Sequence, residues 1–328
     1  MDQDKINDLL KKVPGSRRAA NGIIIDLPDG NFFHITNFHS LESMDGLSTE
    51  EAFFLAFCSR NEIIRMRSLR TAHDSLLYYR ANAIVDEPRA VRVMERRKAA
   101  FEENGRRWSL SEYYHSMDGF RKAYIQNLSK KNQKKLKALP AGMAFVNEAN
   151  AMCKRTFVGD FVVVSETLEK LFYYMNVGLF GEELDIWMGD RVNALLIALR
   201  IMNGTETLDF DIDSRGELPI KTHRAIQKLV QSQMEFTFGH EYAHYLLNHL
   251  SPPDVNLKIQ DSDKNMRLGK KEHSNINYTY DKEYEADLYA IKFIEKDLDS
   301  QKNTVVGADL PHMMVPVREL VTGLVSMR

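Results

Sequence analysis

Two histidines and one glutamate in a short stretch have the spacing of a zinc site. The motif has the form H-E-x-x-H and comprises His240-Glu241-Tyr242-Ala243-His244, inside an otherwise apolar run. Residues four apart share one face of a helix, so both imidazoles would point at the same metal ion. Two neutral imidazoles suit zinc, and a catalytic zinc keeps three protein ligands and one open position. Glu241 lies beside the histidines and can take a proton from a water molecule.

An acidic motif further along the chain offers the third ligand. It comprises Glu283-Tyr284-Glu285-Ala286-Asp287 and opens a second apolar run that is typical of a helix. Glu283 and Glu285 are about 200° apart around a helix, so only one of them can face the metal. We predict Glu283, because its four-residue spacing puts Asp287 on the same face. Asp287 can then accept a hydrogen bond from the free ring N–H of a ligand histidine.

The alternative for the first motif is a core helix with two buried, hydrogen-bonded histidines. The second motif favours a metal, since it follows His244 by 39 positions (283 − 244) and is flanked by alanine and aromatic residues. The sequence therefore predicts a Zn2+ site with His240, His244 and Glu283 as ligands and Glu241 as the general base.

Together the two motifs resemble those of the gluzincin zinc metallopeptidases. Residues 240–249 are similar to the H-E-x-x-H-x-L-L-x-H form of the ImmA/IrrE family. Residues 283–290 are similar to that family's E-x-E-A-N/D-x-F-A, and also to the E-x-x-A-D of HtpX-like membrane peptidases. The phage-exclusion protease Lit carries a related H-E-x-x-H. The resemblance covers about residues 225–295.

The resemblance implies a zinc-dependent endopeptidase of the gluzincin type that cleaves one specific intracellular protein, in regulation or in phage defence. Such an enzyme needs a donor to the oxyanion of the tetrahedral intermediate, which is usually His or Tyr. The sequence offers five candidates and does not choose among them: Tyr245, His273, Tyr278, Tyr280 and His312.

The residues after the first motif exclude another class of zinc peptidase. A metzincin would continue as H-E-x-x-H-x-x-G-x-x-H. In this chain the glycine position is Leu247 and the third histidine position is Leu250. His249 is one residue short of that position, and we expect it at the end of the helix, where a histidine is favourable near the negative end of the dipole.

The composition is that of a globular protein with a sizeable core. The chain has 328 residues, of which 44% are hydrophobic and 27% charged, and its net charge is -2. This charge gives no global field toward nucleic acid or an anionic membrane. The two cysteines, Cys58 and Cys153, form no C-x-x-C pair, which favours a reducing compartment. No apolar run approaches the ~18 residues of a membrane span, and the first residues resemble no signal peptide. We therefore expect a cytoplasmic protein and no membrane partner.

The first half of the chain is expected to serve recognition. Residues 23–27 and 31–35 flank a Pro-Asp-Gly turn and predict a β-hairpin. Residues 48–137 are expected to be mainly helical. Arginines recur through this region, and lysines in residues 130–137, but glutamates are interleaved, so a surface for a protein partner is favoured over nucleic acid. Pro140-Ala141-Gly142 predicts a hinge. It divides the chain into an N-terminal hairpin and helical recognition region, residues 1–140, and a zinc metallopeptidase domain, residues 141–328.

The second half is expected to combine a small sheet with the helix of the H-E-x-x-H motif. Residues 161–164 predict a strand, and Ser165 or Thr167 can cap a helix after it. An exposed strand edge can bind a substrate in extended form, and whether residues 161–164 form that edge is open. Further helices are predicted around residues 192–199 and from about residue 222 to 249, before a long polar connection over residues 251–282. The predicted fold class is α+β, mainly helical, with a gluzincin-like catalytic half.

A second function remains open for this pattern. The zinc half can be a structural or regulatory module, and the arginine-rich N-terminal half the working part that binds nucleic acid or a protein. Glu241 argues against this reading, because only catalysis requires a base at that position. For the peptidase, the expected partners are a protein substrate and an activating protein.

Overall fold

The computed structural model describes residues 3–19, 22–26, 32–35, 46–85, 87–250 and 280–293. The chain is α+β and mainly helical, as predicted. Among the described helices, none is long and apolar enough to cross a membrane. Three of the predicted site candidates, His273, Tyr278 and His312, lie outside the described residues, as does most of the connection over residues 251–282.

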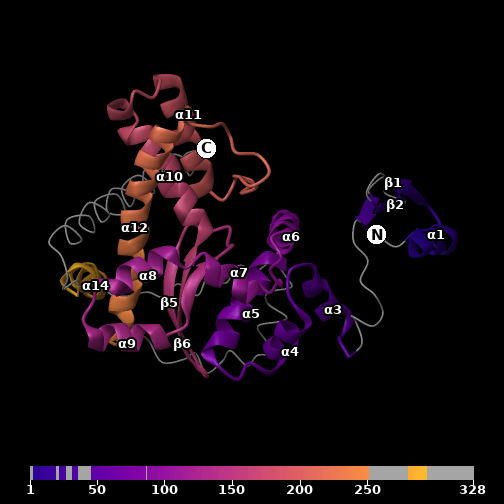
Figure 1. Cartoon of the computed structure of the whole chain (residues 1–328), viewed down its shortest axis with the longest axis horizontal. Coiled ribbons are helices and arrows are strands. Elements are labelled where there is room, and N and C mark those ends of the chain that lie inside the picture. The colour runs from indigo at the N-terminus through magenta and orange to yellow at the C-terminus, as the bar shows by residue number, and fades with distance from the viewer. Residues whose placement is uncertain are drawn as a thin grey trace.

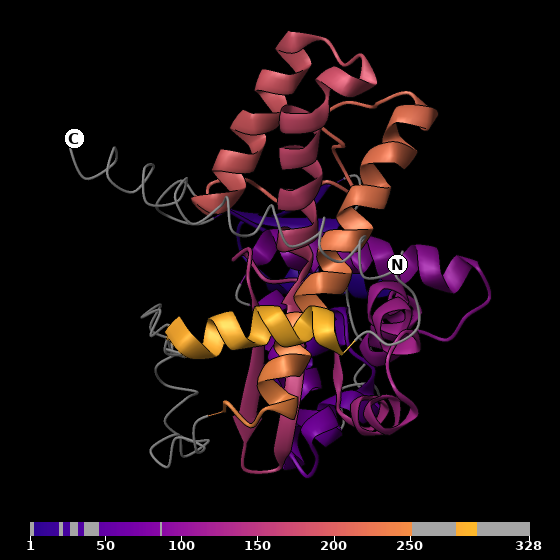
Figure 2. The ribbon, with the colours of Figure 1, turned by 90° about the vertical axis from the view of Figure 1, so that its left-hand side faces the viewer.

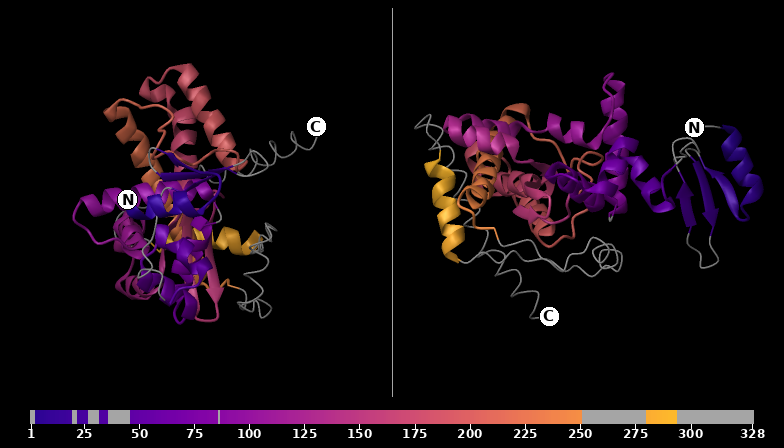
Figure 3. Two further views of the ribbon diagram at one scale, coloured as in Figure 1. Left: turned by 90° about the vertical axis from the view of Figure 1, so that its right-hand side faces the viewer. Right: turned by 90° about the horizontal axis from the view of Figure 1, so that it is seen from below.

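The N-terminal elements form a small sheet packed with one helix (Figure 3). They are α1 (Gln3–Lys12), β1 (Ser16–Ala19), β2 (Gly22–Asp26) and β3 (Phe32–Ile35). β2 and β3 pair antiparallel, with Ile24 opposite His34, which confirms the predicted hairpin. β1 adds a third antiparallel strand on the other side of β2.

Residues 49–138 are mainly helical, as predicted. The elements are α3 (Thr49–Ala52), the 3-10 helix η1 (Phe53–Ala56), α4 (Arg60–Ser68), α5 (Ala72–Val85), α6 (Pro88–Glu103), α7 (Leu110–Ser116), α8 (Gly119–Gln126) and α9 (Lys130–Ala138). A capping box at Ser48 begins α3, since the Ser48 amide donates to the Glu51 carboxylate and the Glu51 amide donates to the Ser48 hydroxyl.

The second sheet comprises β4 (Ala141–Ala144), β5 (Ala151–Thr156) and β6 (Gly159–Ser165) in the order β4-β6-β5. β4 lies parallel to β6, and β5 lies antiparallel to it. The segment predicted as a hinge is therefore a largely buried strand, because Ala141 to Ala144 pair with β6 in the core. Residues 161–164 form a strand as predicted, but the strand is central, which answers the question about the edge. The outer edge beside the H-E-x-x-H helix belongs to β5.

The remaining helices pack in two pairs, α10 (Glu166–Phe180) with α11 (Met188–Met202) and α12 (Ile220–Leu246) with α14 (Tyr280–Lys292). The 3-10 helix η2 (Glu182–Leu184) lies between α10 and α11. Of the two predicted caps of α10, Ser165 is the one used, since its hydroxyl accepts from the Leu168 amide at 3.1 Å. α12 passes beside the sheet (Figure 1). α14 crosses α12 (Figure 2). The motif helix begins after Pro219 and ends at Leu246, before the predicted end near residue 249.

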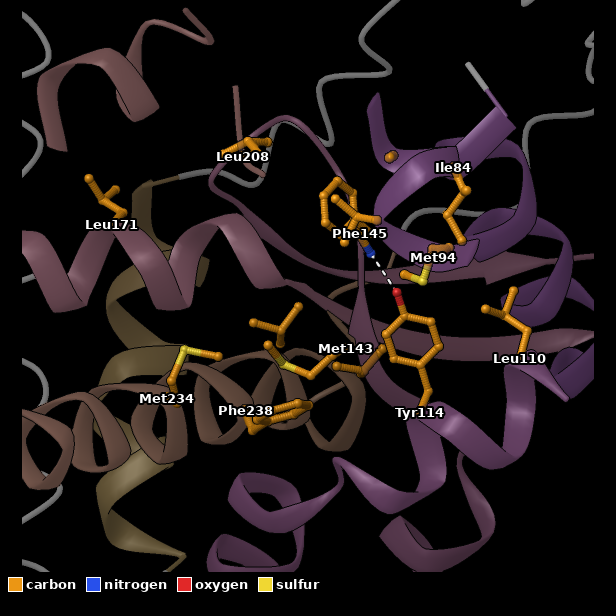
Figure 4. Packing of buried hydrophobic residues seen from close by; sticks show 14 of the residues in the cluster. Ile84, Met94, Leu110, Tyr114, Met143, Phe145, Leu171, Leu208, Met234 and Phe238 are labelled. Atoms are coloured by element: carbon orange, nitrogen blue, oxygen red, sulfur yellow. Dashed lines mark hydrogen bonds between the residues drawn. The ribbon is translucent and has the colours of Figure 1, made fainter. Parts of the chain in front are cut away.

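One hydrophobic core connects the helices of the first half to the sheet and to α12. Its buried members extend from Ala52 to Leu250. Within it the Tyr114 hydroxyl accepts from the Phe145 amide at 3.0 Å (Figure 4). The same hydroxyl donates to Glu166 at 2.8 Å. The core thus extends across residue 140, and the division of the chain at that residue stays a prediction.

Candidate metal centre

The two motif histidines and Glu283 come together where α14 crosses α12. His240 Nε2 lies 2.9 Å from His244 Nε2 and 3.2 Å from one carboxylate oxygen of Glu283, while His244 Nε2 lies 3.6 Å from the other oxygen. One ligand atom from each residue lies within 4.8 Å of the others. In a tetrahedral zinc site with bonds of about 2.0–2.1 Å, ligand atoms are about 3.3 Å apart. The three donors therefore fit a zinc ion in number, type and spacing.

Small residues allow the two helices to approach closely enough for this cluster. Ala286 and Ala290 of α14 are fully buried, and Phe236 of α12 packs against Ala290. Gly239 of α12 lies against the ring of Tyr124 from α8. The Tyr124 hydroxyl donates to the backbone oxygen of Ala290 at 2.8 Å. Three helices are thereby held together at the point where the acidic motif faces the histidines.

Asp287, the remaining acidic residue of the predicted site, contacts the ring of His240 on the side away from the proposed metal. Asp287 Oδ1 lies 2.8 Å from His240 Nδ1. When Nδ1–H donates to this carboxylate, Nε2 of the same ring is free to bind a metal. The structure places Glu283 rather than Glu285 beside the Nε2 atoms, which is the arrangement that the four-residue spacing to Asp287 predicts.

The charges around the cluster favour a cation. Burial acts to lower the pKa of His240, but the Asp287 and Glu283 carboxylates outweigh it and raise that pKa to about 10. Burial likewise acts to raise the pKa of Glu283, but hydrogen bonding to His240 and His244 lowers it to about 2. A bound metal ion would satisfy the same demand for positive charge.

Glu241 differs from the other carboxylates of the site. It is only 6% exposed, and its Oε2 has no hydrogen-bond partner among the described residues. The backbone of Cys153 in β5 hydrogen-bonds to its carboxylate, while burial, aided by the charge of Glu283, raises the pKa of Glu241 to about 7. A carboxyl group with a pKa near neutrality can both take and give a proton.

The expectation for His249 is wrong. α12 ends at Leu246, and Asn248 then adopts a left-handed conformation, with φ of 57°. The chain turns back, and the His249 amide donates to the His244 backbone oxygen at 2.9 Å. His249 is 5% exposed, and its ring lies between His244 and Glu285, at 3.1 Å from each. Sequence reasoning missed both His249 and Glu285. The one signal for them was that each occupies a fixed position in the motifs of the resembling family.

The positions of the five candidates do not identify one of them as the oxyanion donor. Tyr245 is half-buried in the last turn of α12. Tyr280 is 90% exposed at the start of α14. His273, Tyr278 and His312 lie outside the described residues.

Comparison with known proteins gives the chain no relative, because no family model, no curated protein and no solved structure matches it. The likeness to gluzincins therefore rests on the two motifs.

Proposed function

We propose that this chain is a zinc-dependent endopeptidase. The observation that carries the proposal is the convergence of His240, His244 and Glu283 beside a buried glutamate, one oxygen of which has no partner in the part of the chain that the structure describes. The first three supply the ligand set of a catalytic zinc with one open position. The fourth, Glu241, stands next to them as the group that a hydrolytic reaction requires in addition.

The chemistry divides between the ion and the residues of the chain. A zinc ion bound there would supply Lewis-acid activation of a water molecule and of the scissile carbonyl group. Glu241 would take the proton of the attacking water through its free Oε2 and deliver it to the leaving amine nitrogen. Asp287 would hold His240 in the orientation and tautomer that metal binding requires.

The position of β5 supports a peptide as the substrate. β5 is an edge strand of its sheet, and the backbone of Cys153 is directed at Glu241. An extended peptide that adds to a strand edge satisfies its backbone hydrogen bonds there. On this proposal the scissile bond would lie beside the edge of β5 and in front of Glu241.

The biological role proposed here follows the resemblance of the motifs. A gluzincin similar to the ImmA/IrrE family, or to a Lit-like phage-exclusion protease, would cleave one specific protein in regulation or phage defence. This part of the proposal is an analogy between sites and not a consequence of the geometry.

The alternative function, a zinc-stabilised regulatory module that binds nucleic acid or a protein through its first half, has one observation in its favour. α9 presents five exposed lysines and no acidic residue. Several arginines of the same half are occupied within the chain, since Arg65 pairs with Asp74 and Arg67 pairs with Glu51. Two of the arginines that suggested nucleic acid are thus held in internal pairs, which favours the peptidase.

The first experiment measures bound metal in the full-length protein prepared without chelator. We expect about one zinc per chain, and loss of that zinc in His240→Ala, His244→Ala and Glu283→Ala. A wild-type protein without metal would end the proposal.

The second experiment separates catalysis from structure. Glu241→Gln should retain zinc and fold but produce no new protein N-termini when expressed in cells, whereas the wild type should produce them. Glu235→Gln is the matched control, because Glu235 lies on the same helix and bonds Gln231 at 2.8 Å. Equal cleavage by Glu241→Gln and wild type would remove Glu241 as the base.

A further inference from the structure

Two side chains beyond the proposed ligands, His249 and Glu285, form a continuous series of contacts that ends at the ligand His244. Nδ1 of His244 lies 3.1 Å from Nδ1 of His249. Nε2 of His249 lies 3.1 Å from Oε2 of Glu285. The three residues come from α12, from the turn that follows it, and from α14. None of them is the outer partner of His240, which is Asp287.

For a neutral His249, the donors and acceptors along this series of contacts follow from the carboxylate of Glu285. A carboxylate only accepts hydrogen bonds, so the Nε2 of His249 must carry a proton and donate it to Glu285. With His249 in its neutral form, which has one N–H, Nδ1 of His249 is an acceptor. The contact between the two Nδ1 atoms then requires that His244 donates. With its proton on Nδ1, His244 directs the lone pair of Nε2 toward His240 and Glu283.

The backbone holds this arrangement rather than leaving it to side-chain rotation. His244 is 0% and His249 5% exposed, so water cannot easily replace either partner. The His249 amide donates to the His244 backbone oxygen, and Lys282 Nζ donates to the His249 backbone oxygen at 3.1 Å. Arg155 of β5 donates to Asn248 Oδ1 at 3.2 Å. The turn is thus fastened to α12, to α14 and to the sheet.

We propose that His249 and Glu285 are positioning residues of the metal centre, and that Glu285, acting through His249, holds His244 in the tautomer that can bind the metal. The inference rests on the metal site proposed above. It gives a separate task to each acidic residue of the second motif. Glu283 binds the metal, Glu285 sets the tautomer of the second histidine through an intervening ring, and Asp287 sets that of the first histidine directly.

The first test measures zinc affinity by competition with a chelator of known affinity, on metal-stripped full-length protein. Loss of an outer partner of a ligand histidine typically weakens metal binding by about 10–100-fold, and we expect that range for His249→Phe and for Glu285→Leu. His249→Asn and Glu285→Gln should bind more tightly than these two, because each keeps an oxygen that can accept the hydrogen bond. Asp281→Asn is the matched control. It removes one negative charge from the same helix, and its affinity should stay near that of the wild type.

The second test begins with the wild type, for which misfolding of a variant is no concern. In the zinc-loaded wild type labelled with 15N-histidine, nuclear magnetic resonance reports which ring nitrogen carries the proton. We expect Nδ1–H on His244 and Nε2–H on His249, and we expect the His244 signal to change in Glu285→Leu.

The outcomes separate this inference from the proposed function. A wild type that binds no zinc overturns both. A wild type that binds zinc, together with Glu285→Leu at unchanged affinity or with the proton on Nδ1 of His249, overturns the inference alone and leaves the peptidase proposal standing. If His249→Phe fails to fold, the half-exposed Glu285 and the spectrum of the wild type decide the question.

Discussion

Gly239, the residue before His240 of the proposed metal site, gives a stability prediction whose sign depends on packing. In the interior of a helix, alanine is more favourable than glycine by about 1 kcal/mol. Propensity alone therefore predicts that Gly239→Ala stabilises the protein. A Cβ at this position, however, would lie 2.6 Å from Cε2, 2.7 Å from Cζ and 2.9 Å from the hydroxyl oxygen of Tyr124. Carbon atoms in good contact are about 3.5–4.0 Å apart, so the ring would have to move by about 1 Å.

The ring has little freedom to move. Tyr124 is 1% exposed, it packs against Tyr242 with ring centroids 6.1 Å apart, and its hydroxyl donates to the Ala290 backbone oxygen. Overpacking a core costs about 1–3 kcal/mol, and loss of the hydrogen bond adds about 1 kcal/mol. After the gain in propensity is subtracted, Gly239→Ala should lower the free energy of unfolding by about 1–3 kcal/mol.

The same displacement should reach the metal centre. Tyr124 connects α8 to α14, and α14 carries Glu283 and Asp287. Movement of Ala290 would shift both carboxylates relative to the histidines of α12. We expect zinc affinity to fall on the order of tenfold, the lower end of the effect of outer-shell changes.

Urea unfolding of the metal-stripped protein measures the first effect, and chelator competition measures the second. Gly119→Ala is the control, because Gly119 begins α8 and an added Cβ meets no atom within 4 Å. This control should be unchanged or slightly more stable. Combining Gly239→Ala with Tyr124→Leu should cost less than the sum of the two single changes, since the smaller side chain leaves room for the methyl group. A Gly239→Ala protein as stable as Gly119→Ala would refute the reasoning.

Three further predictions concern the site, the pH dependence of stability and the N-terminal sheet. Asp287→Ala should weaken zinc binding by about 10–100-fold in a chelator competition. Burial acts to raise the pKa of Asp211, but the hydrogen bond and charge of Arg97 outweigh it and hold the pKa below its ordinary value of 3.8. A lowered folded-state pKa stabilises above the unfolded value and is lost as the pH falls through the folded one. Asp211→Asn should therefore destabilise the protein at pH 7, and urea unfolding should show this difference shrinking as the pH falls below 3.8. Deleting residues 1–45 should leave zinc content and thermal unfolding of the rest nearly unchanged, because the main core begins at Ala52.

The parts of the site that sequence could predict are those that helix periodicity governs. His240 and His244 are four apart on α12, and Glu283 and Asp287 are four apart on α14. Each pair shares a face whatever the rest of the fold does. Only the contact between the two helix faces depends on tertiary structure. The residue types indicated that contact, because neither pair supplies the three ligands of a metal site by itself.

Periodicity was no guide to the residues that lie beyond a helix end. The helical pattern of residues 245–249 continues past Leu246, but the left-handed conformation of Asn248 sends the chain back and brings His249 inside. That reversal depends on backbone conformation at one residue. The partner of Glu285 could not be predicted for the same reason.

In the second sheet, the sequence predicts the central strand but not the two strands beside it. Val162, Val163 and Val164 predict a strand because a central strand is buried on both faces. The neighbouring strands are short and carry small or charged residues, Ala-Gly-Met-Ala in β4 and Lys154-Arg155 in β5. Glycine and proline at the start of β4 favour a turn in any local reading. Pairing with β6 overrides that preference, and no local pattern contains this information.

The environment of Glu241 bears on the choice between a catalytic and a structural metal centre. Glu283 and Asp287 each have a ring nitrogen of His240 within about hydrogen-bond distance, and Glu285 has one of His249. Glu241 is more buried than any of them, yet one of its oxygens has no partner among the described residues. A buried polar atom without a hydrogen bond costs about 1–3 kcal/mol, and more when it is charged. A structural zinc site gains nothing from such a group, since a glutamine or an apolar residue of similar size would fill the same space. A peptidase requires it, because the free oxygen is where the proton of the attacking water must go. Exchange of Glu241 for glutamine should thus cost the fold little and the activity everything, which is why this variant discriminates between the two functions better than removal of a ligand.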